Sequence, residues 1–169
     1  MLVRQLICNC TRSYSSSRAM VLEKGHLLKL SRTFSDSDVT DYSKLSFDSN
    51  PLHFNVDCAR NAGFQDRPVP GMLVATLFPR IIAFHFLKQT ENYLVQHNPG
   101  AIYVSQTLQF KLPVYTGEDI VGVVQATNIR EIKNKYMVKF ETKCFNGIDM
   151  LVIDGEAKAV LPTLNIEHV

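Results

Sequence analysis

The chain has 169 residues, of which 46% are hydrophobic and 20% are charged, a composition that suits one globular domain. No apolar run reaches the roughly 18 uncharged residues that a membrane span needs. The formal net charge is +2, but 15 basic residues face 16 acidic ones once the three arginines of the first 22 residues are set aside. A nucleic-acid-binding protein normally has a basic excess, so the charge argues against that class.

The first 22 residues have the composition of an import signal. They contain Arg4, Arg12 and Arg18, four serines between residues 13 and 17, and no acidic residue. Organelle transit peptides share this arginine- and serine-bearing, acid-free composition. We expect residues 1–19 to be a mitochondrial transit peptide that directs the folded domain, residues 20–169, to the matrix. Chloroplast import and a disordered tail are the alternatives.

The folded domain is expected to begin with a strand and a capped helix. Residues 21–31 alternate apolar and polar side chains and predict a strand. Ser35-x-x-Asp38 resembles a capping box, in which each side chain accepts a free N–H at the start of a helix. Apolar residues then recur at helical spacing and predict a helix over residues 36–47, which delivers Asp48 at its C-terminal end.

The next six residues, Asp48-Ser49-Asn50-Pro51-Leu52-His53, place a carboxylate and an imidazole five positions apart. Neighbours on one helix face lie three or four positions apart, and Pro51 disfavours a continuous helix. The chain is therefore expected to turn after Asp48 and to bring His53 back towards it. Asp48 and Asn50 are also common turn formers, but a turn alone does not account for His53. A carboxylate at the negative pole of a helix is disfavoured there, which favours a functional role.

The segment after His53 predicts a short helix over residues 56–63, with Asp57 near its start and Gly63 as its C-cap. A proline-rich connector follows. The helix that begins after Gly71 is apolar on nearly every face, so we expect it to be buried and to be kinked or ended by Pro79. The Gly71 N–H at its start is free to stabilise a developing oxyanion.

The remainder of the chain predicts strands. Residues 103–112 alternate apolar and polar side chains, with Gln106 as the single polar exception on the apolar side. Further strands are expected over residues 120–126, 135–144 and 151–159, with Asn146-Gly147 as a hairpin turn. One polar and one apolar face indicate an antiparallel meander covered on one side only. A sheet wrapped around the buried helix hides both, which predicts a single α+β domain.

Other reactive residue types give no site. Cys58 and Cys144 lie far apart and belong to no CxxC pair, so neither a zinc site nor a disulfide is expected. His26, His85 and His97 are interpreted as structural or surface residues.

Four motifs, taken in order, resemble the MaoC-like family of type 2 (R)-specific hydratases and dehydratases. They are Phe34-Ser35-x-x-Asp38-x-x-x-Tyr42-Ser43, Asp48-x-Asn50-Pro51-Leu52-His53, Ala59-Arg60-x-Ala62-Gly63-Phe64 and Gly71-Met72-Leu73. The resemblance covers residues 21–162. It implies a single hot-dog domain, usually a homodimer, in which the antiparallel sheet wraps around the central apolar helix. An overhanging helical segment then carries the active-site loop.

The resemblance also implies an activity, the interconversion of (R)-3-hydroxyacyl and trans-2-enoyl thioesters by removal or addition of water, with no metal and no cofactor. Together with the transit peptide, it implies a dehydratase of acyl carrier protein thioesters in mitochondrial type II fatty acid synthesis. An (R)-specific enoyl-CoA hydratase of β-oxidation, acting on CoA thioesters, is one alternative. A non-catalytic hot-dog acyl-binding protein is the other, although an intact Asp48, Asn50 and His53 argue against it.

Carried over residue by residue, Asp48 and His53 match the family's catalytic acid/base pair, and Asn50 matches a supporting residue of the same loop. Gly71 matches the glycine whose backbone N–H polarises the thioester carbonyl. The acyl chain is expected beside the central helix, in a slot lined by Met72, Leu73, Phe78 and Phe110.

The sequence departs from the family pattern at two positions. Pro70 stands where the family usually has histidine, and it removes one backbone N–H while leaving that of Gly71. Asn55 stands where the family often has an acid two residues after the catalytic histidine, which puts the tuning of His53 in doubt.

Overall fold

The structure is a computed structural model that describes residues 22–88, 100–133 and 135–161. The predicted transit peptide and His97 lie outside the described residues. Five strands within those ranges form one antiparallel sheet in the order β1-β3-β4-β5-β2. Their bounds are β1 (Leu27–Thr33), β2 (Ile102–Phe110), β3 (Asp119–Ile132), β4 (Lys135–Asn146) and β5 (Leu151–Leu161).

The order of the strands corrects one prediction. β3, β4 and β5 follow one another as hairpins, as expected, but β2 does not pair with β3. Instead β2 pairs with β5 at the far side of the sheet, from Ile102↔Val160 to Phe110↔Ile153. The simple meander is therefore wrong for β2, because an alternating pattern shows which face of a strand is buried and not which strand lies beside it.

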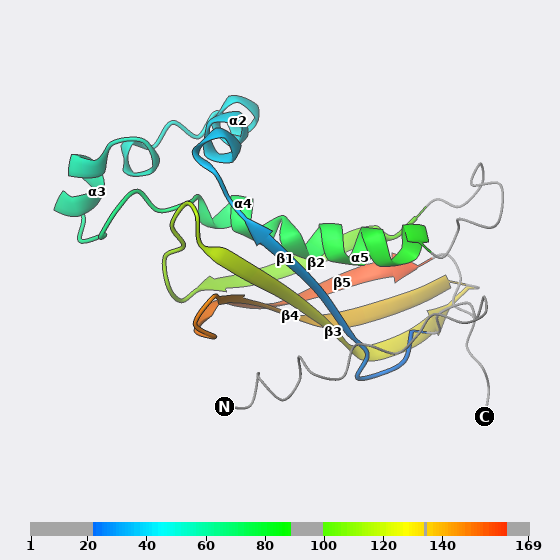
Figure 1. Cartoon of the computed structure of the whole chain (residues 1–169). Coiled ribbons are helices and arrows are strands. Elements are labelled where there is room, and N and C mark those ends of the chain that lie inside the picture. The colour runs from blue at the N-terminus through cyan, green and yellow to red at the C-terminus, as the bar shows by residue number, and fades with distance from the viewer. Residues whose placement is uncertain (1–21, 89–99, 134, 162–169) are drawn as a thin grey trace.

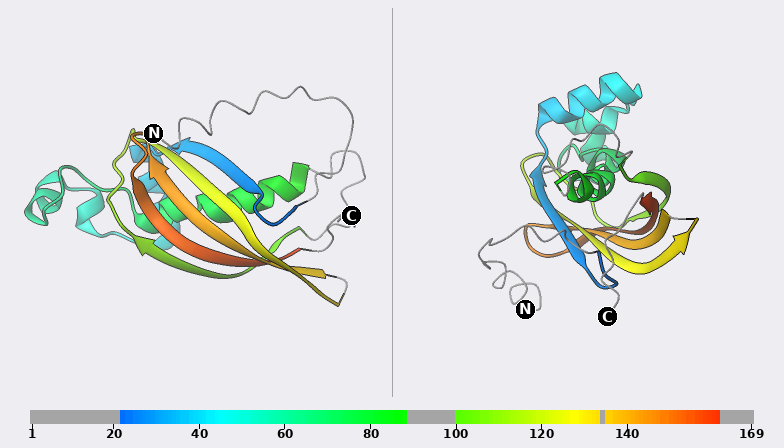
Figure 2. Two further views of the ribbon diagram at one scale, coloured as in Figure 1. Left: turned by 90° about the horizontal axis from the view of Figure 1, so that it is seen from below. Right: turned by 90° about the vertical axis from the view of Figure 1, so that its right-hand side faces the viewer.

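The sheet curls around the apolar stretch that follows Gly71 (Figure 1; Figure 2, right), which confirms the predicted α+β arrangement. This stretch forms two helices, α4 (Gly71–Ala75) and α5 (Leu77–Lys88). Pro79 lies in the first turn of α5, where its ring would collide with the carbonyl of Ala75 in a continuous helix. The interruption predicted from Pro79 is thus present, and α4 ends four residues before it.

The expected complete burial of this helix is wrong for the single chain. Leu73, Leu77 and Phe78 are buried against the sheet, but Met72 and Phe84 are 55% and 50% exposed. The sheet leaves these two side chains uncovered. One curled sheet covers only one side of a helix, so an all-round apolar helix keeps an uncovered stripe.

Gln106, the exception in the alternating pattern of β2, lies on the inner side of the sheet. A register shift between Tyr103 and Ser105 turns Val104 outward and places Tyr103 on the same side as Gln106. The Gln106 amide donates to the hydroxyl of Thr142, at 3.0 Å, and accepts the hydroxyl of Tyr103. Thr142 is fully buried, so Gln106 supplies the hydrogen bond that this hydroxyl needs.

An overhanging segment lies beyond one end of the sheet, at the upper left of Figure 1. It consists of α2 (Asp36–Ser46), a short 3-10 helix η1 (Pro51–His53) and α3 (Val56–Asn61). The predicted capping box at the start of α2 is confirmed, since the Ser35 hydroxyl accepts the Asp38 N–H and the Asp38 carboxylate accepts the Ser35 N–H. α2 ends one residue earlier than predicted, with Phe47 as a left-handed C-cap.

α3 (Val56–Asn61) begins at the predicted residue, with Asp57 in its first turn, but it ends two residues earlier than predicted. Its N-cap is Asn55, whose side-chain oxygen accepts the N–H groups of Asp57 and Cys58 at 2.9 and 3.0 Å. Its C-cap is Ala62, and Gly63 follows with a φ of +91°. An asparagine N-cap stabilises a helix by about 1 kcal/mol relative to alanine. The side chain of Asn55 is therefore engaged with α3, away from the imidazole that its departure from the family pattern was expected to affect.

Candidate active site

Asp48 follows α2 and is fixed by its own loop. Its backbone N–H donates to the Ser46 hydroxyl at 3.1 Å, and its carbonyl accepts the Ser43 hydroxyl at 2.6 Å. One carboxylate oxygen, Oδ1, accepts the N–H of Asn50 at 3.1 Å. The other oxygen, Oδ2, points towards His53 and can accept a hydrogen bond from a bound molecule.

Asn50 completes the turn. Its side-chain oxygen accepts the N–H of Leu52 at 3.2 Å and caps η1, in which Pro51 occupies the first turn. An asparagine that binds the backbone two residues ahead forms a rigid local turn. The supporting role expected of Asn50 is in this geometry a structural one, because the turn carries the chain from Asp48 round to His53.

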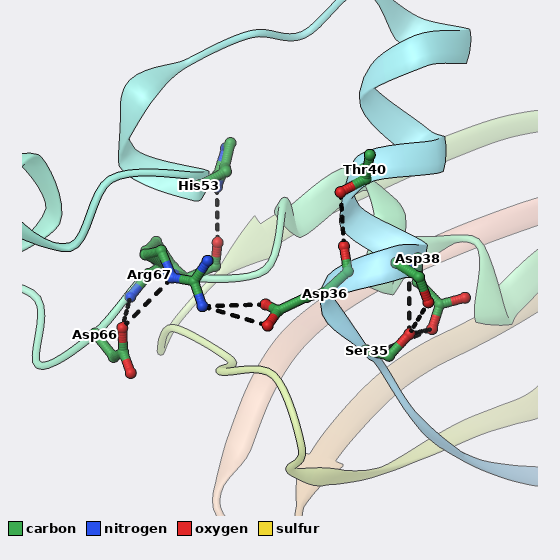
Figure 3. A network of polar contacts seen from close by, with 9 residues as sticks. Ser35, Asp36, Asp38, Thr40, His53, Asp66 and Arg67 are labelled. Carbon is green, nitrogen blue, oxygen red and sulfur yellow. Dashed lines mark hydrogen bonds and ion pairs between the residues drawn. The ribbon is translucent and has the colours of Figure 1, made fainter.

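His53 is the most enclosed of these side chains, with 13% of it exposed. Its Nδ1 lies 2.7 Å from the carbonyl oxygen of Pro68 (Figure 3). A carbonyl oxygen only accepts, so Nδ1 carries the proton and donates it. In the neutral ring Nε2 then presents a lone pair, and this is the nitrogen that faces Asp48.

The two titratable groups approach without touching. The distance from His53 Nε2 to Asp48 Oδ2 is 3.9 Å, which is too long for a hydrogen bond. A single water or substrate hydroxyl can bind both groups at once across such a gap. The sequence placed these residues five positions apart, and the fold brings a base and a carboxylate to one point.

Gly71 is the first residue of α4. The N-cap of α4 is Pro70, which provides no side-chain hydrogen bond to the first turn. The first N–H groups of a helix have no partner within the helix, so the Gly71 N–H is available to an acceptor. A Cβ on Gly71 would lie 2.7 Å from Cε1 of Phe110. Only glycine fits there while the phenylalanine ring keeps its place.

His53 and Gly71 line the same pocket, which has a volume of about 430 Å³. This size lies within the range of small-molecule sites. Of the four residues expected to line the acyl slot, Met72 and Phe110 line this pocket, whereas Leu73 and Phe78 are buried in the core and do not. Apolar wall residues that the sequence analysis did not single out are Leu52, Val69, Val74, Leu112, Val114 and Ile153.

The backbone carbonyl of Pro68 is the functional group that the sequence analysis missed. It sets the proton on His53 Nδ1, yet a carbonyl is common to all residues and carries no signal of its own. The rigid proline-rich connector was the only indication. Pro68 is held by a β-bridge to Tyr115, and the neighbouring Val69 N–H donates to the Val114 carbonyl at 2.7 Å.

Two further observations concern the described residues as a whole. Among the described residues, no three histidine, cysteine or carboxylate side chains gather into a group that could hold a metal ion. Within the same part of the chain, no helix is both long and apolar enough to cross a membrane. The groups that the structure brings together are an imidazole, a carboxylate, a backbone amide and an apolar pocket.

The chain is similar to known proteins in both sequence and fold. Residues 10–144 match the family described as MaoC like domain. The chain is 58% identical over 155 residues to a mitochondrial 3-hydroxyacyl-(acyl-carrier-protein) dehydratase of Solanum lycopersicum, a match that covers 92% of this chain and 87% of the relative. It is 51% identical over 157 residues to the mitochondrial enzyme of the same description from Arabidopsis thaliana, with the same coverage.

A solved structure supports the same relationship. The (R)-hydratase of Aeromonas caviae involved in PHA biosynthesis superposes with a TM-score of 0.69 at 33% identity. The match covers 83% of this chain and 98% of the hydratase. The fold and most of the described length are therefore shared with a hydratase.

Proposed function

The chain belongs to the MaoC-like domain family and has the hot-dog fold, and we propose that it dehydrates (R)-3-hydroxyacyl thioesters to trans-2-enoyl thioesters. Its substrates would be carried on acyl carrier protein in mitochondrial type II fatty acid synthesis. The observation that carries this proposal is the His53 Nε2 lone pair, held 3.9 Å from the Asp48 carboxylate at a pocket shared with Gly71. The dehydratase names of the two relatives above 50% identity support the substrate class.

The reaction removes a proton from C2 and a hydroxyl from C3. The Gly71 N–H donates to the thioester oxygen and stabilises the negative charge that forms there as the C2 proton leaves. The electron pair of the C2–H bond becomes the C2–C3 double bond while the C3–O bond breaks. The C3 hydroxyl takes up the proton that His53 Nε2 removed from C2 and leaves as water, which returns the imidazole to its neutral form.

We assign the proton transfer to His53 and the orientation of the departing water to Asp48. His53 Nε2 is the available base, because Nδ1 is engaged with Pro68. Asp48 Oδ2 faces the same gap and accepts a hydrogen bond from the water or from the C3 hydroxyl. A positioned acid or base contributes typically about 10²–10⁴-fold to a rate.

The test is hydration of crotonyl-CoA, followed by the loss of enoyl absorbance. Asp48→Asn and His53→Ala are expected to lose at least about 10²-fold in kcat while they still fold. Wild-type rates in both variants would remove the site assignment. An inactive wild type would favour the alternative of a non-catalytic acyl-binding protein.

The hydratase alternative needs a second measurement. Bacterial relatives named (R)-specific enoyl-CoA hydratase are 33% and 34% identical to the chain. We expect kcat/KM for one acyl chain to be higher on acyl carrier protein than on CoA. Equal values, or a preference for CoA, would favour the hydratase.

We further propose a homodimer formed through β2. β2 is an edge strand with no charged residue, and its Ile102 and Val104 are each 51% exposed. The opposite edge strand, β1, carries Lys29 and Arg32, charges that protect a sheet edge from pairing. Pairing of β2 with its copy about a two-fold axis would cover the unprotected edge.

The location follows from the N-terminus and from the relatives. Both plant relatives are described as mitochondrial, and we propose that residues 1–19 are the transit peptide that brings the chain to the matrix. A fluorescent fusion of residues 1–22 is expected to enter mitochondria, and diffuse or plastid fluorescence would contradict the assignment.

A further inference from the structure

We propose that the ion pair between Arg67 and Asp36 is a positioning device that sets the separation of Asp48 and His53. This inference rests on the proposed function, since it concerns the same two groups. Arg67 and Asp36 are 31 positions apart in the sequence, and neither lines the pocket. They join the start of α2, the helix that precedes Asp48, to the connector whose Pro68 carbonyl accepts from His53 (Figure 3).

The first of these parts is α2, which delivers Asp48 from its C-terminal end. Asp36 is the first residue of α2, and its carboxylate accepts from an Arg67 Nη at 3.2 and 3.4 Å. The second part is the connector that orients His53, since Arg67 immediately precedes Pro68, whose carbonyl accepts the His53 Nδ1 proton. The pair thus ties the start of the Asp48 helix to the residue beside the His53 acceptor.

The connector is also held in place by the segment between β2 and β3. The β-bridge between Pro68 and Tyr115 and the hydrogen bond from Val69 to Val114 fix it to the segment between β2 and β3. The Gln65 N–H also donates to the Tyr115 hydroxyl at 3.2 Å. Because the connector is fixed to the sheet side, the ion pair transmits that fixed position to α2.

The first turn of α2 makes one other ion pair to the described part of the fold, on a different side of the helix. Asp38 pairs with Arg32 of β1 at 2.7 Å. Two residues advance a helix by about 200°, so Asp36 and Asp38 face nearly opposite directions. A single tether leaves a helix free to pivot, whereas tethers on opposite sides of the first turn define the direction of its axis.

The length of α2 amplifies any pivot. Its 11 residues span about 16 Å, so a tilt of about 5° at the start moves the far end by about 1.4 Å. A misplacement of about 1 Å can cost about 10²-fold in rate. Exposed ion pairs contribute little to stability, and the Asp36 side chain is 65% exposed. The pair is therefore expected to affect the rate much more than the melting temperature.

The experiment compares Arg67→Gln, Asp36→Asn and the double variant with Lys44→Met, all in the full chain and with crotonyl-CoA as substrate. Lys44→Met is the matched control, because it removes an exposed ion pair to Asp41 on the same helix. Each single variant is expected to lower kcat about tenfold, with KM within about twofold and Tm within about 2 °C of the wild type. The double variant should be no slower than the singles, Arg67→Lys should recover part of the rate, and the control should match the wild type.

Three results would overturn the proposal. They are an unchanged kcat in both single variants, losses that multiply in the double variant as for independent sites, and an equal loss in Lys44→Met. A fall in kcat that is matched by a fall in the folded fraction would also assign the pair to stability alone.

A readout without catalysis separates this proposal from the proposed function. The ring nitrogens of His53 are observed by long-range ¹H–¹⁵N NMR and assigned by comparison with His53→Ala. Arg67→Gln and Asp36→Asn are expected to shift these signals, and Lys44→Met is not. Unmoved signals would overturn the positioning role, whether or not the protein hydrates crotonyl-CoA. A wild type that is inactive while the signals move would instead overturn the proposed function.

Discussion

At the scale of single residues, each titratable group of the site uses one atom for a structural hydrogen bond and keeps a second atom for the substrate. His53 uses Nδ1 for the Pro68 carbonyl and keeps Nε2, and Asp48 uses Oδ1 for the Asn50 N–H and keeps Oδ2. Fixing one atom of each group orients the other without occupying it. This arrangement limits the freedom of the reacting atoms before a substrate arrives, which lowers the entropy cost of reaching the transition state.

Gly71 is a residue at which one added methyl group is expected to affect both stability and rate. The methyl group of Gly71→Ala would lie 2.7 Å from Phe110, so either the ring or the start of α4 must move. We expect a loss of about 1–3 kcal/mol in stability from overpacking and about tenfold or more in kcat. Urea unfolding and the crotonyl-CoA assay measure the two effects.

Gly147→Ala is the control for that variant. A Cβ there meets no atom nearer than the Asp119 carbonyl oxygen at 3.8 Å, so stability and kcat should be nearly unchanged. Adding Phe110→Leu to Gly71→Ala should restore part of the stability by making room. A fully active Gly71→Ala would show that the close approach of Phe110 is not required.

At the scale of elements, α2 is held at its start by charges that do more than favour the helix dipole. Asp36 pairs with Arg67, and Asp38 accepts the Ser35 N–H and pairs with Arg32. The Ser35 backbone N–H above all, then the Ser35 hydroxyl and Arg32, hold the pKa of Asp38 below its ordinary value. The ionised form of Asp38 is therefore the one that the folded state stabilises.

The sign of that shift gives a pH prediction. A carboxyl group with a lowered folded pKa adds stability that is present above its unfolded pKa of about 3.9 and is lost as the pH falls through the folded value. Asp38→Asn should therefore cost about 1 kcal/mol at pH 7, and the difference from the wild type should be smaller at pH 3. Urea unfolding at the two pH values checks this, with Asp41→Asn as the control that changes neither. A constant difference at both pH values would contradict the assignment to the ionised carboxylate.

At the scale of the whole molecule, the uncovered apolar surface is the main feature of the single chain. Met72 of α4 and Phe84 of α5 are exposed, and the uncharged edge strand β2 has no covering element among the described residues. Met72 and Phe110 line the pocket and are more than half exposed. A second copy seated on β2 would account for such exposure of large apolar side chains.

The proposed dimer implies that an added charge has different effects on the two sheet edges. Val104→Lys on β2 is expected to convert a dimer into a monomer in light scattering after size exclusion, because it places a charge on the pairing edge. Leu27→Lys is the control on β1, the opposite edge, where Lys29 already provides a charge. A monomeric wild type, or a Val104→Lys variant that stays dimeric, would rule out this interface.

The sequence by itself determined the elements and the chemistry of the loop. Local signals are enough for the Ser35–Asp38 capping box, the interruption before Pro79 and the turn between Asp48 and His53, because each rests on neighbouring residues and on fixed steric rules. The residue types of the loop also supply an acid and a base, and the resemblance to the family motifs predicts that both belong to one site.

Only the tertiary structure decided which distant groups meet. The pairing of β2 with β5, the Pro68 carbonyl on His53, the Phe110 ring over Gly71 and the Arg67–Asp36 ion pair all join positions far apart in the chain. Periodicity reports the face on which a residue lies and not its partner across a gap. The 3.9 Å between Asp48 and His53 is likewise set by where α2 and the connector are anchored, and no spacing along the chain contains that information.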